Sequence, residues 1–526
     1  MKGITRFSRM HLIRNCAFAI LFFALLLTGC DGMGETETPE TESLPVNAVE
    51  SGVMAGDYEE TLTAFLDRDG SDGYAGDYVL VYRPTLEGES KPMGTLDGLV
   101  ETTANQVPSR DGTYLQTTDI YKEKDPYLTD EIRQADICYD LVGGDLWQVG
   151  FQRVFYANHP KLPNEMLFQV SAVGERCRVW SPVNPAYSPL EGIDPSYPEQ
   201  LAQEMDAAIP VLEQSFGAIP DIRGDGKMNI ICVDFNDPNT LGYTPYTDIY
   251  DEVSVNGQTM RGNSLPIVYI NTAVLIDGTY SELSEIYAAV VHEMEHTIFS
   301  AQLGGDGSIT ISASKSLFAE FLSVAAQDVV YPGSGIRHYL PWWYSETAVW
   351  EDLASSSADV YLRGKKGGRQ NGKSMFQSTG YNADYAAMFL LAHFIENRSG
   401  RDFLTNVINY IDMDSHGEDT RKFWKGIWEG LGYEDYPTFM EDFLLSILLH
   451  EEDGPYRLHP FEGYDPAFCD GEENPFSHLV PIITDKGLYV EGGGFAVLRP
   501  VGGVYHPPVT ASKDLCYVGI TLKEIE

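Results

Sequence analysis

The segment His292-Glu293-Met294-Glu295-His296 constrains the fold of this chain more than any other stretch, because its two histidines must share one helical face. Apolar residues recur around it at helical spacing, which predicts an amphipathic helix with one side against the core. They are Leu283, Ile286, Tyr287, Val290, Met294 and Ile298. Side chains four positions apart lie one turn apart, so both imidazoles can reach a single ion. The alternative is a pair of hydrogen-bonded core histidines.

The chemistry of these residue types favours a zinc site. Neutral imidazole nitrogen suits zinc, and a third protein ligand leaves the fourth position open to water. Glu293 follows the first histidine directly, at the shoulder of the same face, where its carboxylate can take a proton from that water. We therefore predict His292 and His296 as ligands and Glu293 as the proton acceptor.

Glu320 is the predicted third ligand. It lies among apolar side chains on a second predicted helix, 312–329. A buried carboxylate needs a partner charge or a metal, and an ion held by the two histidines would supply one. Two alternatives stay open: Glu320 faces solvent, or Asp306, on a Gly-rich turn, is the third ligand instead.

Two tyrosines provide a candidate for a further role at the metal. Tyr381 and Tyr385 lie four positions apart at the start of another predicted helix, which ends near Gly400. Residues at this spacing share a face, so one of the two phenols could lie over the metal.

The N-terminal thirty residues carry the features of an export signal. A basic start precedes an apolar stretch, 17–27, that is too short to be a comfortable membrane span. Leu27-Thr28-Gly29-Cys30 resembles a bacterial lipobox, which implies removal of residues 1–29 and lipidation of Cys30. The alternatives are a plain signal peptide or an anchor helix. We expect a lipid-anchored protein of the bacterial cell envelope, on the periplasmic or cell-surface side.

Composition divides the rest of the chain into segments. Residues 30–56 are acidic and cannot bury enough apolar surface to become ordered, so they predict a flexible tether. Short alternating runs predict a β-rich domain at 57–190, with strands at 78–82, 147–151 and 166–170. Residues 191–460 mix helices and strands around the histidine motif, and 461–526 return to β patterning. We expect an α+β, multidomain chain.

The charge and the cysteines exclude several classes of protein. A net charge of −43 opposes binding to nucleic acid and repels anionic headgroups, so a lipid on Cys30 would be the membrane attachment. Beyond Cys30 the cysteines are sparse and odd in number, which argues against a disulfide scaffold or a cysteine zinc site. Two pairings stay open, Cys469 with Cys516 and Cys138 with Cys177.

Several motifs follow one another between about residues 220 and 410. They are a Gly242-Tyr243 loop, a strand at 266–271, the H-E-x-x-H helix, a downstream helical Glu, and Tyr-x-x-x-Tyr before Gly-Arg-Asp-Phe-Leu. This order resembles the hyicolysin-type zinc metallopeptidases, a gluzincin group. The resemblance implies a mostly helical zincin-type peptidase domain with a small sheet, zinc ligands His292, His296 and Glu320, and catalytic Glu293. One departure is that Phe321 follows Glu320, where the family usually has Gly.

The mechanism that this resemblance implies is metal-assisted hydrolysis of a peptide or protein substrate, and we expect an endopeptidase rather than an exopeptidase. Glu293 would take a proton from water and return it to the leaving amine. Tyr381 or Tyr385 would hydrogen-bond the developing oxyanion. The competing hypothesis is a surface-tethered binding or adhesion lipoprotein with a structural or degenerate metal site. Glu293 favours the enzyme, because a structural site has no use for a carboxylate beside the water position.

Overall fold

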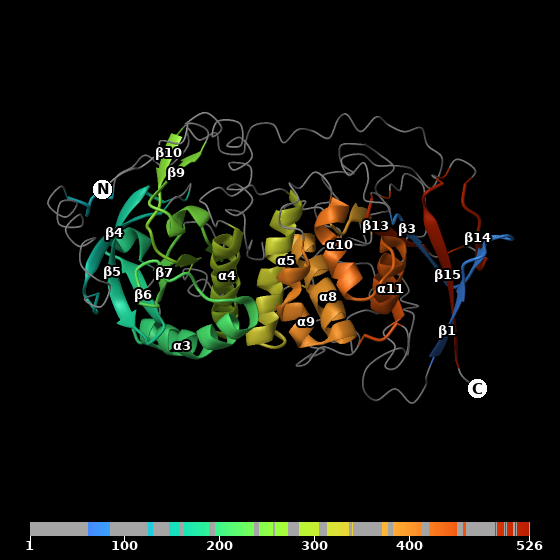
Figure 1. The fold of residues 1–526 in the computed structure, drawn as a ribbon, viewed down its shortest axis with the longest axis horizontal. Helices are drawn as coiled ribbons and strands as arrows, with labels where there is room; N and C mark the ends of the chain where they lie inside the picture. The colour runs from blue at the N-terminus through green and yellow to red at the C-terminus, as the bar shows by residue number, and fades with distance from the viewer. Residues whose placement is uncertain are drawn as a thin grey trace, which may run out of the picture. The chain divides into compact units, whose positions relative to one another are not determined.

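A computed structural model describes residues 62–84, 125–129, 147–157, 159, 162–188, 195–235, 241–255, 258–271, 283–303, 313–335, 339, 371–376, 382–411, 420–449, 456–458, 490, 492–498, 500, 502–508, 511 and 513–524. Helices and sheets occur together, as expected for an α+β chain (Figure 1). The chain divides into two compact units, one with residues 1–36 and 110–312, the other with 37–109 and 313–526.

The first unit is built on a six-stranded sheet of strand order β4-β5-β6-β7-β11-β8. Its strands are β4 (Gln152–Tyr156), β5 (Glu165–Val173), β6 (Cys177–Pro182), β7 (Met228–Val233), β8 (Gly242–Tyr243) and β11 (Ile267–Asn271). β7 runs parallel to both of its neighbours, β6 and β11. Parallel strands need a long crossover connection, and α3 (Tyr197–Phe216) supplies it between β6 and β7.

Two of the described helices pack on this sheet. α3 lies on β5 and β6, α4 (Leu283–Leu303) lies on β11 and β8, and the helices contact each other (Figure 1). Successive strand residues point to opposite faces, and every second residue of β7 and β11 enters a separate, aromatic core. This core includes Trp147, Phe155, Phe168, Trp180, Ile231, Val233, Tyr243, Ile267 and Tyr269.

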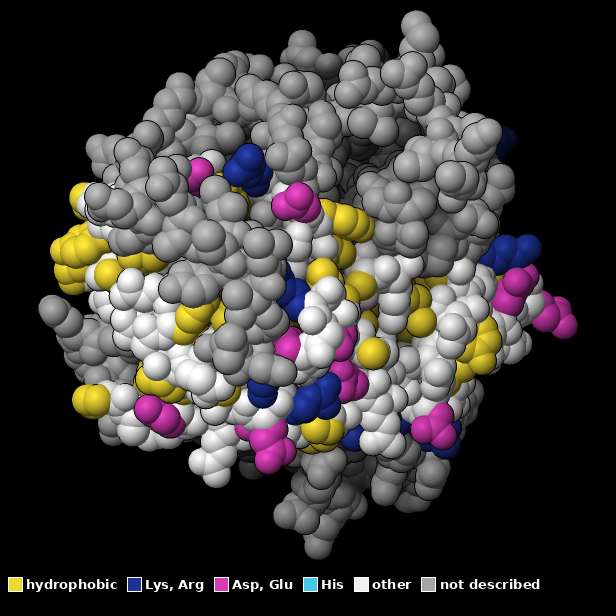
Figure 2. All heavy atoms as spheres, turned by 60° about the vertical axis from the view of Figure 1, so that its left-hand side comes forward, with side chains coloured by type: hydrophobic (Ala, Val, Ile, Leu, Met, Phe, Trp, Pro, Cys, Tyr) yellow, Lys and Arg dark blue, Asp and Glu magenta, His cyan; other side chains and the backbone are white. Residues whose placement is uncertain are grey.

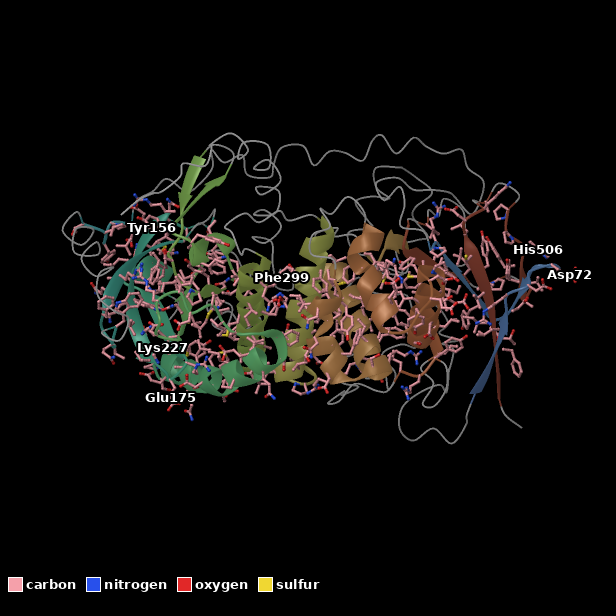
Figure 3. All side chains as sticks on the ribbon, viewed as in Figure 1. Asp72, Tyr156, Glu175, Lys227, Phe299 and His506 are labelled. Carbon is pink, nitrogen blue, oxygen red and sulfur yellow. The ribbon has the colours of Figure 1, made fainter. Side chains whose placement is uncertain are left out.

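Short elements complete the described part of the first unit. They are the 3₁₀ helices η3 (Pro185–Tyr187) and η4 (Tyr246–Ile249) and the hairpin of β9 (Glu252–Val255) and β10 (Gln258–Arg261). Arg261 donates a hydrogen bond from Nη1 to the hydroxyl of Tyr156 at 3.0 Å, which ties the hairpin to the end of β4 (Figure 3). Lys227 Nζ donates to the backbone oxygen of Glu175 at 2.7 Å, which closes the turn between β5 and β6 (Figure 3).

The second unit contains a five-stranded antiparallel sheet of order β1-β15-β3-β13-β12. Its strands are β1 (Leu62–Asp67), β3 (Tyr78–Tyr82), β12 (Asn371–Ser374), β13 (Gly494–Leu498) and β15 (Cys516–Glu524), and a short pair joins β2 (Tyr74–Ala75) to β14 (Val504–Tyr505). Alternate residues of β3 and β13, Val79, Val81, Ala496 and Leu498, form its small core.

A helical layer makes up the rest of the described part of the second unit. It consists of α5 (Ala313–Val330), α8 (Asn382–Ser399), α9 (Arg401–Thr405), η7 (Val407–Tyr410), α10 (Thr420–Gly430) and α11 (Tyr436–Leu449). α5 packs on α8 and α10, and α11 packs on the same two helices. The ring of Phe318 on α5 meets Trp424 of α10 edge-on at 5.4 Å, an arrangement that aromatic pairs favour.

The grouping of strands differs from the sequence prediction. Residues 57–190 do not form one β-rich unit, because β1 and β3 pair with the C-terminal strands β13 and β15, whereas β4, β5 and β6 share a sheet with β7 and β11. The histidine motif therefore lies in a unit with a six-stranded sheet, whereas the resemblance implied a mostly helical domain with a small sheet. The alternation of apolar and polar residues along a strand does not show which distant strand it pairs with. The pattern therefore suggested a domain boundary at 190.

One predicted strand is wrong. Residues 147–151 form a turn, in which the backbone N–H of Phe151 donates to the oxygen of Gln148 at 2.9 Å. Gly150 there has φ 88°, a left-handed conformation that interrupts a strand. β4 begins only at Gln152.

Cys177, Cys232 and Cys516 are free thiols, and burial raises the pKa of Cys177 and of Cys232 to about 12. Their suggested partners Cys138 and Cys469 lie outside the described residues, as do the segments 1–29 and 30–56 with Cys30. Within the described ranges, no helix is long and apolar enough to cross a membrane.

Candidate metal centre

α4 holds the histidine motif in a buried environment. His292 is fully buried, and Glu293 and His296 are 2% and 5% exposed. Four residues of the apolar stripe predicted for this helix are buried as well, namely Ile286, Val290, Met294 and Ile298, whereas Tyr287 is half-buried. Phe299 on the same helix is also buried (Figure 3). On the part of the surface that the structure describes, Figure 2 shows acidic and basic side chains interspersed and no histidine colour on the visible face.

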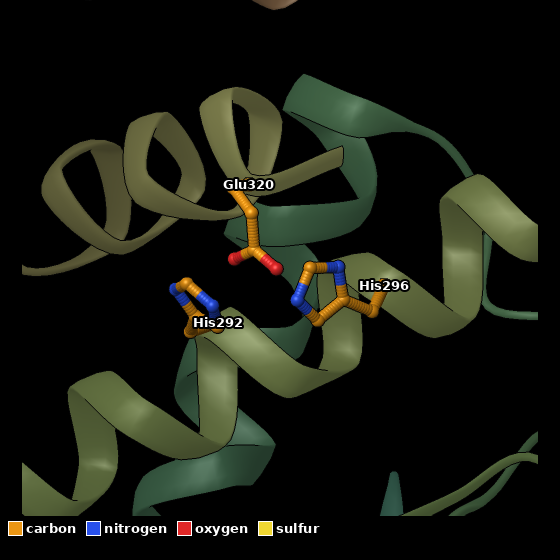
Figure 4. A group of neighbouring side chains, drawn as sticks. All are labelled: His292, His296 and Glu320. Atoms are coloured by element: carbon orange, nitrogen blue, oxygen red, sulfur yellow. The ribbon is translucent and has the colours of Figure 1, made fainter. Parts of the chain in front are cut away.

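His292, His296 and Glu320 form a buried group that could hold a metal ion. Each offers one ligand atom, and these three atoms lie within 4.8 Å of one another. The imidazole ring centroids are 4.9 Å apart, with the ring planes at 89°. Figure 4 shows the carboxylate of Glu320, on α5, directed toward the two rings on α4. Glu320 is 8% exposed, which contradicts the alternative in which it faces solvent.

The donor set of this group fits a transition metal. Calcium and magnesium prefer oxygen ligands, whereas two of the three donors here are imidazole nitrogens. Zinc binds such nitrogens and carboxylate oxygen at about 2.0–2.2 Å. The three ligand atoms, within 4.8 Å of one another, lie close enough together for one ion to be held by all of them. Asp306, the alternative third ligand, lies outside the described residues.

Phe321, which follows Glu320, occupies an apolar position of α5. It is fully buried, its ring stacks on Phe318 at 5.5 Å, and it lies edge-on to Trp424 at 6.1 Å. Neighbouring residues on a helix point about 100° apart. The side chain of Phe321 therefore fills the aromatic core of the second unit, and Glu320 can belong to the metal group beside it.

The two tyrosines are placed only in part. Tyr381 lies outside the described residues. Tyr385, on the first turn of α8, is buried and stacks on Tyr339 with 6.0 Å between ring centroids. The hydroxyl of Tyr339 donates to Oε1 of Gln327 at 2.6 Å. Gln327 is two turns beyond Glu320 on α5, a rise of about 10 Å. The ring of Tyr385 therefore packs through Tyr339 near Gln327, and the role expected of its hydroxyl stays a prediction.

The edge strand β8 supports α4, the helix that carries the histidine motif. The sequence predicts Gly242-Tyr243 only as a loop. Thr244, directly after β8, donates a hydrogen bond from its hydroxyl to the backbone oxygen of Glu293 at 2.9 Å. Both residues are buried, so this bond fixes the turn of α4 that carries Glu293. The sequence around Thr244 carries no pattern that would predict this hydrogen bond.

A buried polar network lies behind β8. The hydroxyl of Tyr243 donates to the backbone oxygen of Ala157 at 2.6 Å, and its ring stacks on Tyr269 at 4.5 Å. Burial raises the pKa of Tyr243 well above its usual value, and the negative charges of Asp248 and Glu293 add to the effect. Burial likewise raises the pKa of Asp248, which accepts a hydrogen bond from Asn263 at 2.6 Å. Tyr243 therefore stays a neutral donor that anchors β8.

Comparison with known proteins adds no assignment: neither a scan against protein-family models nor a search of the curated proteins found a match to this chain.

Proposed function

We propose that this chain is a zinc-dependent metallopeptidase of the bacterial cell envelope. The observation that supports it is the buried group of His292, His296 and Glu320, with Glu293 next to the first histidine on the same helix. Iron(II) also accepts two histidines and one carboxylate. Two histidines one helical turn apart, with a glutamate directly after the first, favour zinc and water activation instead.

The residues divide the chemistry among themselves. His292, His296 and Glu320 would hold the ion, which when bound lowers the pKa of a coordinated water to about 7 and polarises a carbonyl. Glu293 takes the proton of the attacking water and returns it to the leaving amine. Its buried position strengthens electrostatic interactions with the reacting groups, because solvent screens them little. The family resemblance supports an endopeptidase in which Tyr381 or Tyr385 would hydrogen-bond the developing oxyanion.

The experiment that tests this function is cleavage of an unfolded protein and of a mixed peptide library by the purified chain. We expect cleavage that a chelator abolishes and that added zinc restores, with one zinc per chain by elemental analysis. If the chain holds zinc but cleaves neither substrate, the peptidase proposal fails and the binding lipoprotein with a structural metal gains support. Restoration by iron(II) but not by zinc would contradict the choice of metal.

The proposed location rests on the N-terminal signal, which lies outside the described residues. We expect Cys30 to become the first residue of the mature chain and to carry lipid, since Leu27-Thr28-Gly29-Cys30 resembles a lipobox. Labelling with radioactive palmitate in a bacterial host should mark the wild-type chain and not Cys30→Ser. The matched control is Cys16→Ser, directly before the apolar stretch, which should keep the label. Label that persists in Cys30→Ser would contradict lipid attachment at this residue.

A further inference from the structure

Edge strand β8 is held against α4 at the level of Glu293. Gly242 of β8 pairs with Ile270 of β11 in an antiparallel register, and β8 contacts α4. Gly242 is buried. Its backbone does not have a positive φ, so the conformation of the strand gives no reason for glycine here.

The space next to Gly242 is taken by the side chain of Glu293. A Cβ atom built on Gly242 would lie 2.9 Å from Cγ of Glu293, 3.1 Å from its Oε1 and 3.2 Å from Cδ1 of Ile270. Real Cβ atoms essentially never approach a heavy atom more closely than 3.0 Å. Any other residue at position 242 must therefore displace the Glu293 side chain, the strand, or both.

Thr244 fixes the backbone of Glu293. Its hydroxyl donates a hydrogen bond to the Glu293 backbone oxygen at 2.9 Å. Thr244 therefore holds the main chain of Glu293, and Gly242, two residues earlier in the same segment, contacts its side chain. A glutamate side chain has several rotatable bonds, and confining it to one conformation requires walls on its sides. The backbone of Gly242 lies against one of these sides.

We propose that Gly242 is a positioning residue for the general base, and that the absence of a side chain there sets where the Glu293 carboxylate lies. The inference rests on the proposed function, because it assigns a catalytic purpose to a steric contact. A general base must lie within hydrogen-bond reach of the proton it removes. Displacement by about 1 Å can reduce the rate by about 10²-fold.

The test is Gly242→Ala, alone and combined with Glu293→Ala, which removes the Cγ atom that the new methyl group would meet. In the wild-type background we expect kcat to fall by about 10²-fold with KM changed less than about threefold. Zinc content should stay at the wild-type level. The melting temperature should fall by about 2–4 °C in that background and hardly at all in the Glu293→Ala background.

Gly174→Ala is the matched control within the same unit. A Cβ on Gly174 would lie 2.5 Å from Oδ1 of Asp206, a carboxylate that accepts backbone hydrogen bonds from Glu175 and Arg176. This variant meets the same kind of steric conflict far from Glu293 in sequence and outside the metal group. We expect it to lower the melting temperature and to leave kcat unchanged.

The outcomes separate the two proposals. A wild-type chain that cleaves no substrate refutes the proposed function, and the comparison of melting temperatures still measures the contact, because it needs no activity. Wild-type kcat in Gly242→Ala overturns the positioning role. An equal loss of melting temperature in both backgrounds overturns it as well, since the conflict would then lie with Ile270 or the strand. Loss of zinc from Gly242→Ala would also contradict it, by showing a general disturbance of α4.

Discussion

Glu293→Gln should lower kcat by about 10²–10⁴-fold, the usual contribution of a general base, while zinc content and melting temperature change little. The amide cannot take a proton from water at neutral pH, whereas the carboxylate can. The side chain is 2% exposed and fits against Gly242, and glutamine has nearly the same volume and shape. The substitution therefore removes the chemistry and keeps the packing. Steady-state cleavage of a peptide library, with elemental analysis and thermal unfolding, measures all three quantities.

Glu295→Gln is the matched control for this variant. Glu295 lies on the same helix, two residues further, and is equally buried at 1% exposed, but it is not a member of the metal group. We expect Glu295→Gln to retain kcat, whatever its effect on stability. The proposed role of Glu293 is contradicted if its glutamine variant cleaves as fast as the wild type, or if both variants lose activity to the same extent.

The elements around the metal group could be predicted because their signals are local. The apolar period around the motif predicted a buried helix, and α4 spans Leu283–Leu303. The helix predicted at 312–329 is α5, Ala313–Val330, and the strand predicted at 266–271 is β11, Ile267–Asn271. An acidic side chain inside an apolar helix face also indicated that Glu320 is buried near another charged or metal-binding group.

The sheet arrangement and the support of Glu293 could not be predicted, because they depend on contacts between distant segments. β3 lies between β15 and β13, which follow it by about four hundred residues. Alternation shows that a strand is half-buried and does not identify its partner. The steric fit of Gly242 against Glu293 is invisible for the same reason, since a glycine in a short strand reads as a turn signal. The stacking of Tyr385 on Tyr339 likewise joins two segments that local spacing does not connect.

Glu320→Gln should lower the affinity for zinc by more than about 10²-fold, since loss of a partner outside the ligand shell already costs about 10–100-fold. Two neutral imidazoles would remain, without the negative charge that offsets the ion in a buried site. Cleavage should fall to background at limiting zinc. Competition with a chromophoric chelator gives the affinity, and thermal unfolding with and without zinc gives a second measure. At a free zinc concentration 100 times Kd, binding stabilises the wild-type chain by about 2.7 kcal/mol, and the variant should lose this response.

Asp306→Asn separates the two candidates for the third ligand. If Glu320 is the ligand, the Asp306 variant keeps wild-type zinc affinity and the zinc-dependent rise in melting temperature. If the glutamine variant keeps full affinity and Asp306→Asn loses it, the assignment is wrong, and the approach of Glu320 to the two histidines is a packing contact. The pair of ligand variants also complements Glu293→Gln. Loss of zinc together with activity identifies a ligand, whereas loss of activity with zinc retained identifies the residue that moves the proton.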